Sequence, residues 1–152
     1  MTQKTVPMAH RDALLGAIDP DAYAAGTVTT GWISAKNFQS FMAIVMAGDL
    51  GTSATLDAKI EQATDSSGTG AKDLSGAAIT QLTEAGSDSN KQATISFGAD
   101  DLDIANNFTH FRLSMTVATA ASDAGGLVIG SDARIGKASA GDAASVDEVV
   151  IV

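Results

Sequence analysis

Side chains that could act as nucleophiles or acid–base groups are scarce in this chain. It has two histidines, His10 and His110, and no cysteine, which excludes thiol catalysis, disulfides, zinc ribbons and iron–sulfur ligation. A histidine at the entry to an alternating apolar segment, such as His110, is ordinarily a hydrogen-bonded edge or core residue. A Ser–His–Asp arrangement would need convergence in space, and no GxSxG elbow points to one. We therefore predict no catalytic residues and no enzymatic activity.

The acidic residues form one cluster, at Asp100, Asp101 and Asp103. Calcium takes carboxylate and carbonyl oxygens from loops of this kind, but the spacing matches no EF-hand and no glycine–aspartate repeat. Asp147 and Glu148 are adjacent, so on a strand they would point to opposite faces and form no acid–base dyad. We predict a solvated turn at 100–103 and no metal or cofactor. Calcium in the acidic loops stays open as an alternative.

The segment Ser67–Asp73 combines two glycines with a lysine, as phosphate-binding loops do. It lacks the GxxxxGK[ST] spacing and a strand–loop–helix context. A hairpin-type loop is therefore the better interpretation.

The only tryptophan is Trp32 and the only tyrosine is Tyr23. An exposed aromatic ring on a β-sandwich can stack on a sugar, so both residues are candidates for sugar stacking. The alternative is that each ring packs into the core.

Composition sets limits on the partners of the chain. Its 152 residues carry 18 acidic and 9 basic side chains, a net charge of −9. Such a surface repels phosphate backbones and anionic lipids, so we expect neither a nucleic acid nor a membrane as partner. No segment approaches the roughly 20 apolar residues of a membrane span. The first seven residues also lack the apolar stretch of a signal peptide.

Alternation of apolar and polar residues predicts strands from residue 26 onward. The clearest example is 54–61, and the segments 93–97 and 111–117 repeat it. A period of two is typical of a strand with one wet face. The segments 38–46 and 146–152 are apolar with little alternation, which predicts strands buried on both faces.

Shorter strands are expected at 26–33, 79–83 and 126–130, with turn-forming Gly, Asp, Asn and Ser residues between the strands. About eight short strands without alternating helices predict an all-β fold, an antiparallel β-sandwich of the jelly-roll type.

The first 25 residues differ from the rest. Leu14, Leu15 and Ile18 have a spacing compatible with a short helix within 8–18, ended by Pro20. We predict an N-terminal arm, docking segment or edge segment at 1–25, followed by a β-sandwich domain at 26–152. A frayed terminus is the alternative. With Met8, these three residues are the candidate docking contacts.

Several runs of sequence resemble small virion proteins of tailed bacteriophages and related gene transfer agents. The resemblance covers roughly residues 26–130, and its most specific parts are DAKIEQATD at 57–65 and GTGAKDL at 68–74. Its other parts are GWI at 31–33, NFQSF at 37–41, AGDLG at 47–51, AITQL at 78–82 and FTHFRL at 108–113.

This resemblance implies a jelly-roll-like protein that decorates the capsid, as a cement protein or as the base of a head spike, without a catalytic residue. The expected partners are the major capsid protein or other virion proteins. We also expect a homo-oligomer, a trimer or pentamer, located on the capsid surface of the virion. Head or tail location stays open. A carbohydrate-binding jelly-roll module for host-surface attachment is the first alternative, and an enzyme acting on glycans is the second.

Overall fold

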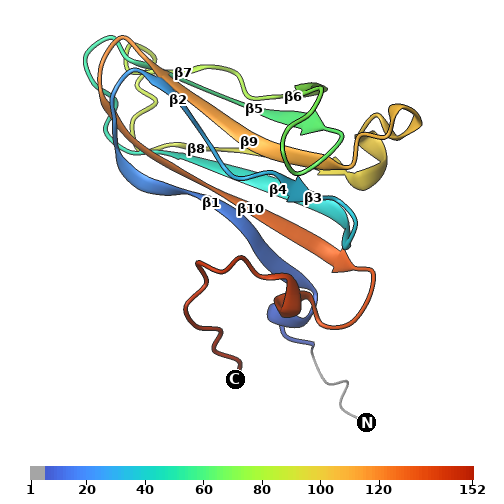
Figure 1. The fold of residues 1–152 in the computed structure, drawn as a ribbon. Helices are drawn as coiled ribbons and strands as arrows, with labels where there is room; N and C mark the ends of the chain where they lie inside the picture. The colour runs from blue at the N-terminus through green and yellow to red at the C-terminus, as the bar shows by residue number, and fades with distance from the viewer. Residues whose placement is uncertain (1–5) are drawn as a thin grey trace.

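The computed structural model describes residues 6–152 and consists of two β-sheets packed face to face (Figure 1). The strands are β1 (Asp12–Tyr23), β2 (Gly26–Thr29), β3 (Ile33–Ser34), β4 (Phe38–Ala47), β5 (Thr55–Ala63), β6 (Lys72–Ala78), β7 (Leu82–Thr83), β8 (Gln92–Gly98), β9 (His110–Ala118) and β10 (Ser122–Ala133). Four short 3₁₀ helices accompany them: η1 (Met8–His10), η2 (Ala99–Asp101), η3 (Ile104–Asn106) and η4 (Ala138–Gly141). In this part of the chain no helix has the length and apolar character needed to cross a membrane.

Pairing of the strands follows a nested pattern. β1 pairs with β10, β2 with β9, β4 with β8, and β5 with β6, all antiparallel. The chain therefore resembles one long hairpin that has been rolled up, which is the jelly-roll arrangement. Rolling it up gives sheet A, in the order β1-β10-β4-β8, and sheet B, in the order β2-β9-β5-β6. The predicted all-β, jelly-roll-like sandwich is confirmed.

The core lies between the two sheets and combines a few large rings with many small side chains. Phe41 of β4, Phe97 of β8 and Phe111 of β9 form a ring cluster with centroids 4.6–5.3 Å apart. Small residues elsewhere let the sheets approach closely. A Cβ on Gly126 would lie 2.8 Å from a methyl carbon of Leu113 in the opposite sheet, so this position has no room for a side chain.

Alternating segments folded as the period of two predicts. In β5, Leu56, Ala58 and Ile60 point inward and are buried, while the polar residues between them are only partly covered. The segments 93–97 and 111–117 became β8 and β9. Residues 64–71 form the loop between the paired strands β5 and β6, as the predicted hairpin-type loop requires.

Two strands escaped the sequence prediction because bulges disturb their period. The predicted helix within 8–18 is wrong, since η1 covers only 8–10 and β1 follows it. Register shifts between Leu14 and Gly16, and between Ile18 and Asp21, bring the spacing of the apolar residues close to that of a helix. In β6, Gly76 adopts φ +78°, so the buried residues Leu74 and Ala77 are three positions apart.

Two segments predicted to be buried on both faces are not. Val146–Val152 forms no strand, and its residues 147–152 are exposed, because no strand of the described chain pairs with it. The segment 38–46 does form β4, but only its inward side chains are buried, whereas Met42 and Met46 are 40% and 46% exposed.

Of the expectations for residues 1–25, the structure agrees with an edge segment for Asp12–Tyr23, and not with an arm separate from the sandwich. Asp12–Tyr23 pairs with β10 along its whole length and forms an edge of sheet A. These residues are therefore part of the sandwich, and only 6–11 of the described chain precede it. The structure does not describe 1–5.

Replacement of Phe111 by alanine tests the core. Phe111 is fully buried and touches both other rings of the cluster, so F111A should lower the free energy of unfolding by about 3–5 kcal/mol. Urea unfolding followed by circular dichroism measures this loss. Ile135, which is 92% exposed, supplies the control: I135A should change the unfolding free energy by less than about 0.5 kcal/mol. Equal effects of the two substitutions would contradict the packing described.

Candidate assembly surface

The outer face of sheet A is covered with apolar side chains. Register places Leu127 of β10 beside Ile44 of β4, and Ile129 beside Met42. Their neighbours in each strand alternate inward into the core, so these four residues point outward. We call the outward apolar set the sheet A face; it consists of Leu14 and Ala17 from β1, Leu127 and Ile129 from β10, and Met42, Ile44 and Met46 from β4.

Such a face is unusual for an antiparallel sandwich, whose outer faces are normally polar. In β4 the inward row is Phe41, Ala43, Val45 and Ala47, all buried. The outward row of Met42, Ile44 and Met46 is apolar as well. A contiguous apolar patch on a protein surface marks a contact site for a protein, ligand or membrane. The continuous apolar run at 38–46 was the sequence signal for this face.

Two hollows lie on the sheet A face. One has a volume of about 850 Å³ and is lined by Pro20, Met46, Gly125 and Leu127, among others. Glycine lets the strands approach closely there, since a Cβ on Gly125 would lie 3.2 Å from the Cα of Pro20 and would push it away by a few tenths of an ångström. The other hollow has a volume of about 470 Å³ and lies between Met8, Met42 and Ile129. Together the hollows give the face relief that a partner's side chains can fill.

Charge is confined to the ends of the face. Asp12, which accepts a hydrogen bond from the Ser131 hydroxyl, lines one hollow, and Asp21 and Asp123 line the other. Neither hollow is lined by a lysine or arginine. The middle of the face is free of charge, so apolar contact there leaves no ion unpaired.

The candidate docking residues divide between the surface and the core. Met8 is 67% exposed and lines the smaller hollow, and Leu14 belongs to the sheet A face. Ile18 is only 4% exposed and lies in the core, and Leu15 packs against the core. The two bulges of β1 cause this division. A shared helical stripe of Leu14, Leu15 and Ile18 is therefore wrong.

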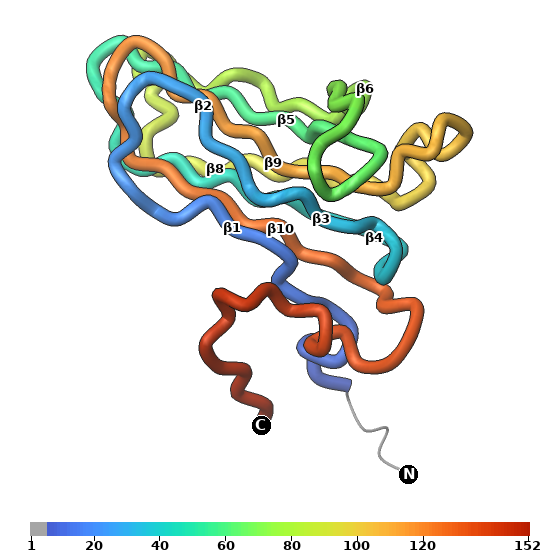
Figure 2. The backbone as a smooth tube through the Cα atoms, in the orientation of Figure 1, coloured from blue at the N-terminus to red at the C-terminus, as the bar shows by residue number. Residues whose placement is uncertain are grey.

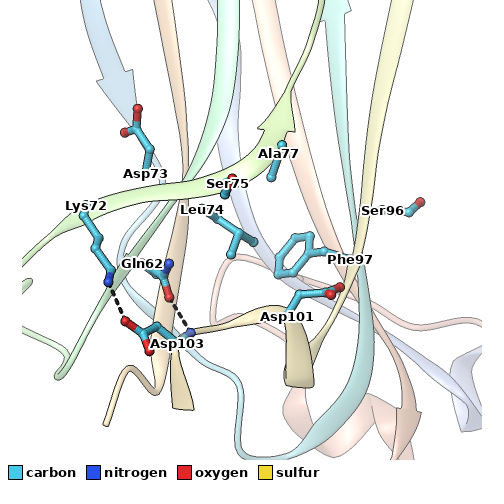
Figure 3. Close-up of a pocket in the computed structure, with 11 residues that line it drawn as sticks. Gln62, Lys72, Asp73, Leu74, Ser75, Ala77, Ser96, Phe97, Asp101 and Asp103 are labelled. Atoms are coloured by element: carbon cyan, nitrogen blue, oxygen red, sulfur yellow. Dashed lines mark hydrogen bonds and ion pairs between the residues drawn. The ribbon is translucent and has the colours of Figure 1, made fainter. Parts of the chain in front are cut away.

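Apart from these two hollows, a polar groove of about 500 Å³ opens between β6 and β8, where the two sheets part (Figure 3). Leu74 and Phe97 contribute apolar lining, and Lys72 reaches Asp103 with a distance of 2.5 Å between Nζ and Oδ2. The Gln62 side chain accepts a hydrogen bond from the Asp103 backbone N–H at 2.9 Å.

Charged groups of this polar groove already have partners. Asp73 pairs with Lys59, and Asp101 accepts a hydrogen bond from the Gly98 N–H at 2.7 Å. The Lys72 ammonium, together with the Asn106 amide, lowers the pKa of Asp103. This arrangement ties the loop at 99–109 to β6, so we assign the groove a structural role. In the residues described, no three metal-ligating side chains gather at one point.

The candidate sugar-stacking residues lie far apart. Trp32 precedes Ile33, which pairs with Phe111, whereas Tyr23 pairs with Ser122 at the other end of the sandwich. The Arg112 guanidinium lies 4.4 Å from the centre of the Trp32 ring, and Gly68 packs against the indole nitrogen. The Tyr23 hydroxyl donates to the Asp19 carbonyl at 2.5 Å. The two rings therefore do not form one platform.

Histidines are also placed apart. His10 ends η1, beside the start of β1, and His110 opens β9, where its Nδ1 lies 2.9 Å from the Thr109 hydroxyl. The adjacent acids Asp147 and Glu148 lie on an exposed segment outside both sheets.

Comparisons with known proteins give similarity of fold only. No family model and no curated protein matches the chain. Among solved structures, that of broad bean stain virus has a TM-score of 0.47 and 11% identity over 87% of this chain and 90% of that chain. A cowpea mosaic virus empty virus-like particle has 0.45 and 8% over 87% and 84%, and infectious bursal disease virus strain Gt has 0.44 and 13% over 80% and 33%. With TM-scores below 0.5, these similarities carry no argument about function.

Substitution of Lys72 tests the electrostatics of the polar groove. K72M removes the ammonium that lowers the pKa of Asp103, so this pKa should rise toward the ordinary value of an aspartate. Carboxyl-carbon NMR shifts followed through acidic pH measure it. Asp88 is the internal control. Its pKa is lowered by the Thr83 N–H and Lys91, and not by Lys72, so it should stay unchanged in K72M. An unchanged Asp103 pKa in K72M would contradict the ion pair.

Proposed function

We propose that this chain is a structural protein of a virus particle, which decorates the capsid as a cement or head-spike component. It acts through protein–protein contacts and without catalysis. Its partners are the major capsid protein or other virion proteins, together with further copies of itself in a trimer or pentamer. Its location is the capsid surface, and neither nucleic acid nor a membrane is a partner.

The observation that carries this proposal is the sheet A face. Within this face Met42 and Met46 are 40% and 46% exposed, on a strand whose other side is already buried in the core. Burial of a large apolar side chain contributes about 1.5–3 kcal/mol, so a partner that covers several of these residues gains substantial free energy. A protein whose task is permanent assembly has a use for such a face.

Two further observations support the same function. The net charge of −9 keeps free copies soluble before assembly. The resemblance to small virion proteins covers roughly residues 26–130, from β2 into β10, and includes β4 with its outward methionines. The N-terminal residues 6–11 extend the same surface, because Met8 lines the smaller hollow of the sheet A face.

Lysine substitutions on the face test the proposal. M42K/M46K places two ammonium groups in the apolar contact, so binding to particles that lack the protein should weaken at least about tenfold. Co-sedimentation with such particles measures the binding. I104K/I135K is the matched control, because it adds two lysines at exposed apolar positions that do not belong to the sheet A face. Equal binding of both variants would contradict this contact.

Deletion of residues 1–11 tests the N-terminal contact. A deletion of 1–25 would remove β1 and with it an edge of sheet A, whereas residues up to Arg11 precede the strand. The shorter deletion should weaken particle binding while the circular dichroism spectrum keeps its β character. Full binding after this deletion would remove Met8 from the docking surface.

A carbohydrate-binding module is the second candidate, and Trp32 is the observation that favours it, since the ring is only partly buried. A glycan array probed with the native chain and W32A decides the matter. Binding that W32A loses would establish the module, whereas an absence of signal from both proteins would exclude the glycans on the array.

A further inference from the structure

The segment that follows β10 is anchored to the edge of sheet A only at its beginning. Ala138 of η4 is buried, and Leu14 of β1 binds the segment through both its backbone N–H and its carbonyl. The Leu14 N–H donates to the Asp142 carboxylate at 2.8 Å, and its carbonyl accepts from the Ala143 N–H at 2.7 Å. Figure 2 shows this segment passing the start of β1. Its root is therefore part of the fold.

Beyond Val146 the segment has no such anchor. No backbone hydrogen bond joins residues 147–152 to the rest of the described chain. Yet the last four residues are all β-branched and apolar, and they are 43%, 73%, 47% and 117% exposed from Val149 to Val152. β-branched apolar runs are typical of buried strands. We call Val149–Val152 the apolar tail.

The described part of the chain thus leaves two apolar surfaces at least partly exposed, the tail and the sheet A face. The root of the tail lies at Leu14, which pairs with Ile129, which pairs in turn with Met42. With strands about 4.8 Å apart, the centre of the face is about 10 Å from the root. Residues 144–152 are long enough to reach the sheet A face of their own chain, but they leave Met42 and Met46 exposed.

We propose that the apolar tail of one copy packs on the sheet A face of a second copy. This inference rests on the proposed function, since it names the contact within the assembled oligomer. A tail of four residues covers only part of the sheet A face, and the rest of the face stays available to the particle. Tail and face are different surfaces, so the contact is heterologous, and its repetition around an axis closes a ring such as a trimer or pentamer. The side chains of the tail and of the middle of the face are uncharged, so contact between them buries no ionised side chain.

Two variants separate the halves of this contact. The chain lacking residues 147–152 keeps the face and loses the tail, whereas M42K/M46K keeps the tail and loses the face. Both should fold as the native chain does, because neither change touches a core residue or a backbone hydrogen bond. Melting curves followed by circular dichroism check this. Each variant alone should self-associate with a dissociation constant roughly a hundredfold or more above that of the native chain.

Mixing the two variants is the decisive experiment. A heterologous contact lets the tail of M42K/M46K occupy the intact face of the truncated chain, so sedimentation velocity should show a 1:1 heterodimer. In a control mixture, I104K/I135K takes the place of M42K/M46K. This variant keeps both the tail and the face, so it should self-associate like the native chain. Two monomers in the mixture would overturn the inference, because a tail that folds onto its own face, or does not bind at all, gives that result.

Failure of the inference and failure of the proposed function give different results. If M42K/M46K loses particle binding while the native chain stays monomeric at high concentration, the face serves the particle and the tail contact is wrong. If the mixture forms the heterodimer but the native chain does not bind particles, the tail contact stands and the decoration function is wrong.

Discussion

The pairing of β1 with β10 is the contact on which the rest of the structure depends. It joins the first and last strands of the jelly roll, and every other pair of the nested series lies between them. It also places Leu14 and Ala17 beside Ile129 and Leu127, which completes the apolar outer face of sheet A. The same strand anchors the segment after β10 through Leu14. A pairing between residues so distant in sequence is slow to form, and it brings both ends of the described chain to one edge of the sheet.

The two sides of sheet A are both apolar. Its inner side must fill a core made largely of small residues, and its outer side carries methionine, isoleucine and leucine where an isolated domain would have polar residues. The carboxylates at the ends of the face and the net charge of −9 oppose the approach of two copies by electrostatic repulsion. The charge-free middle lets them associate when the geometry is right. Methionine suits such a face because its flexible thioether adapts to the surface that it meets.

Sequence patterns predicted the strands whose period is regular, and with them the sandwich. β5, β8 and β9 alternate without interruption, so their inward residues, such as Leu56 and Ile60, were identifiable. β1 and β6 were not, because bulges at Leu14–Gly16 and the positive φ of Gly76 change the spacing of buried residues. The assembly surface was visible only indirectly. The apolar run at 38–46 was correctly seen to be apolar on both sides, but its outer side was assigned to the interior of this chain.

The same reasoning applies to residues 146–152, and it shows where single-chain prediction reaches its limit. Both segments predicted to be buried on both faces turned out to be covered on one side only or on neither. A pattern of apolar residues favours exclusion of water from the side chains, and it does not indicate whether the excluding atoms belong to the same chain. Within the described chain, Met42 stays 40% exposed and Val150 73% exposed. The most economical source of the excluding atoms is another copy, in which the uncovered face of one chain receives the uncovered segment of the next.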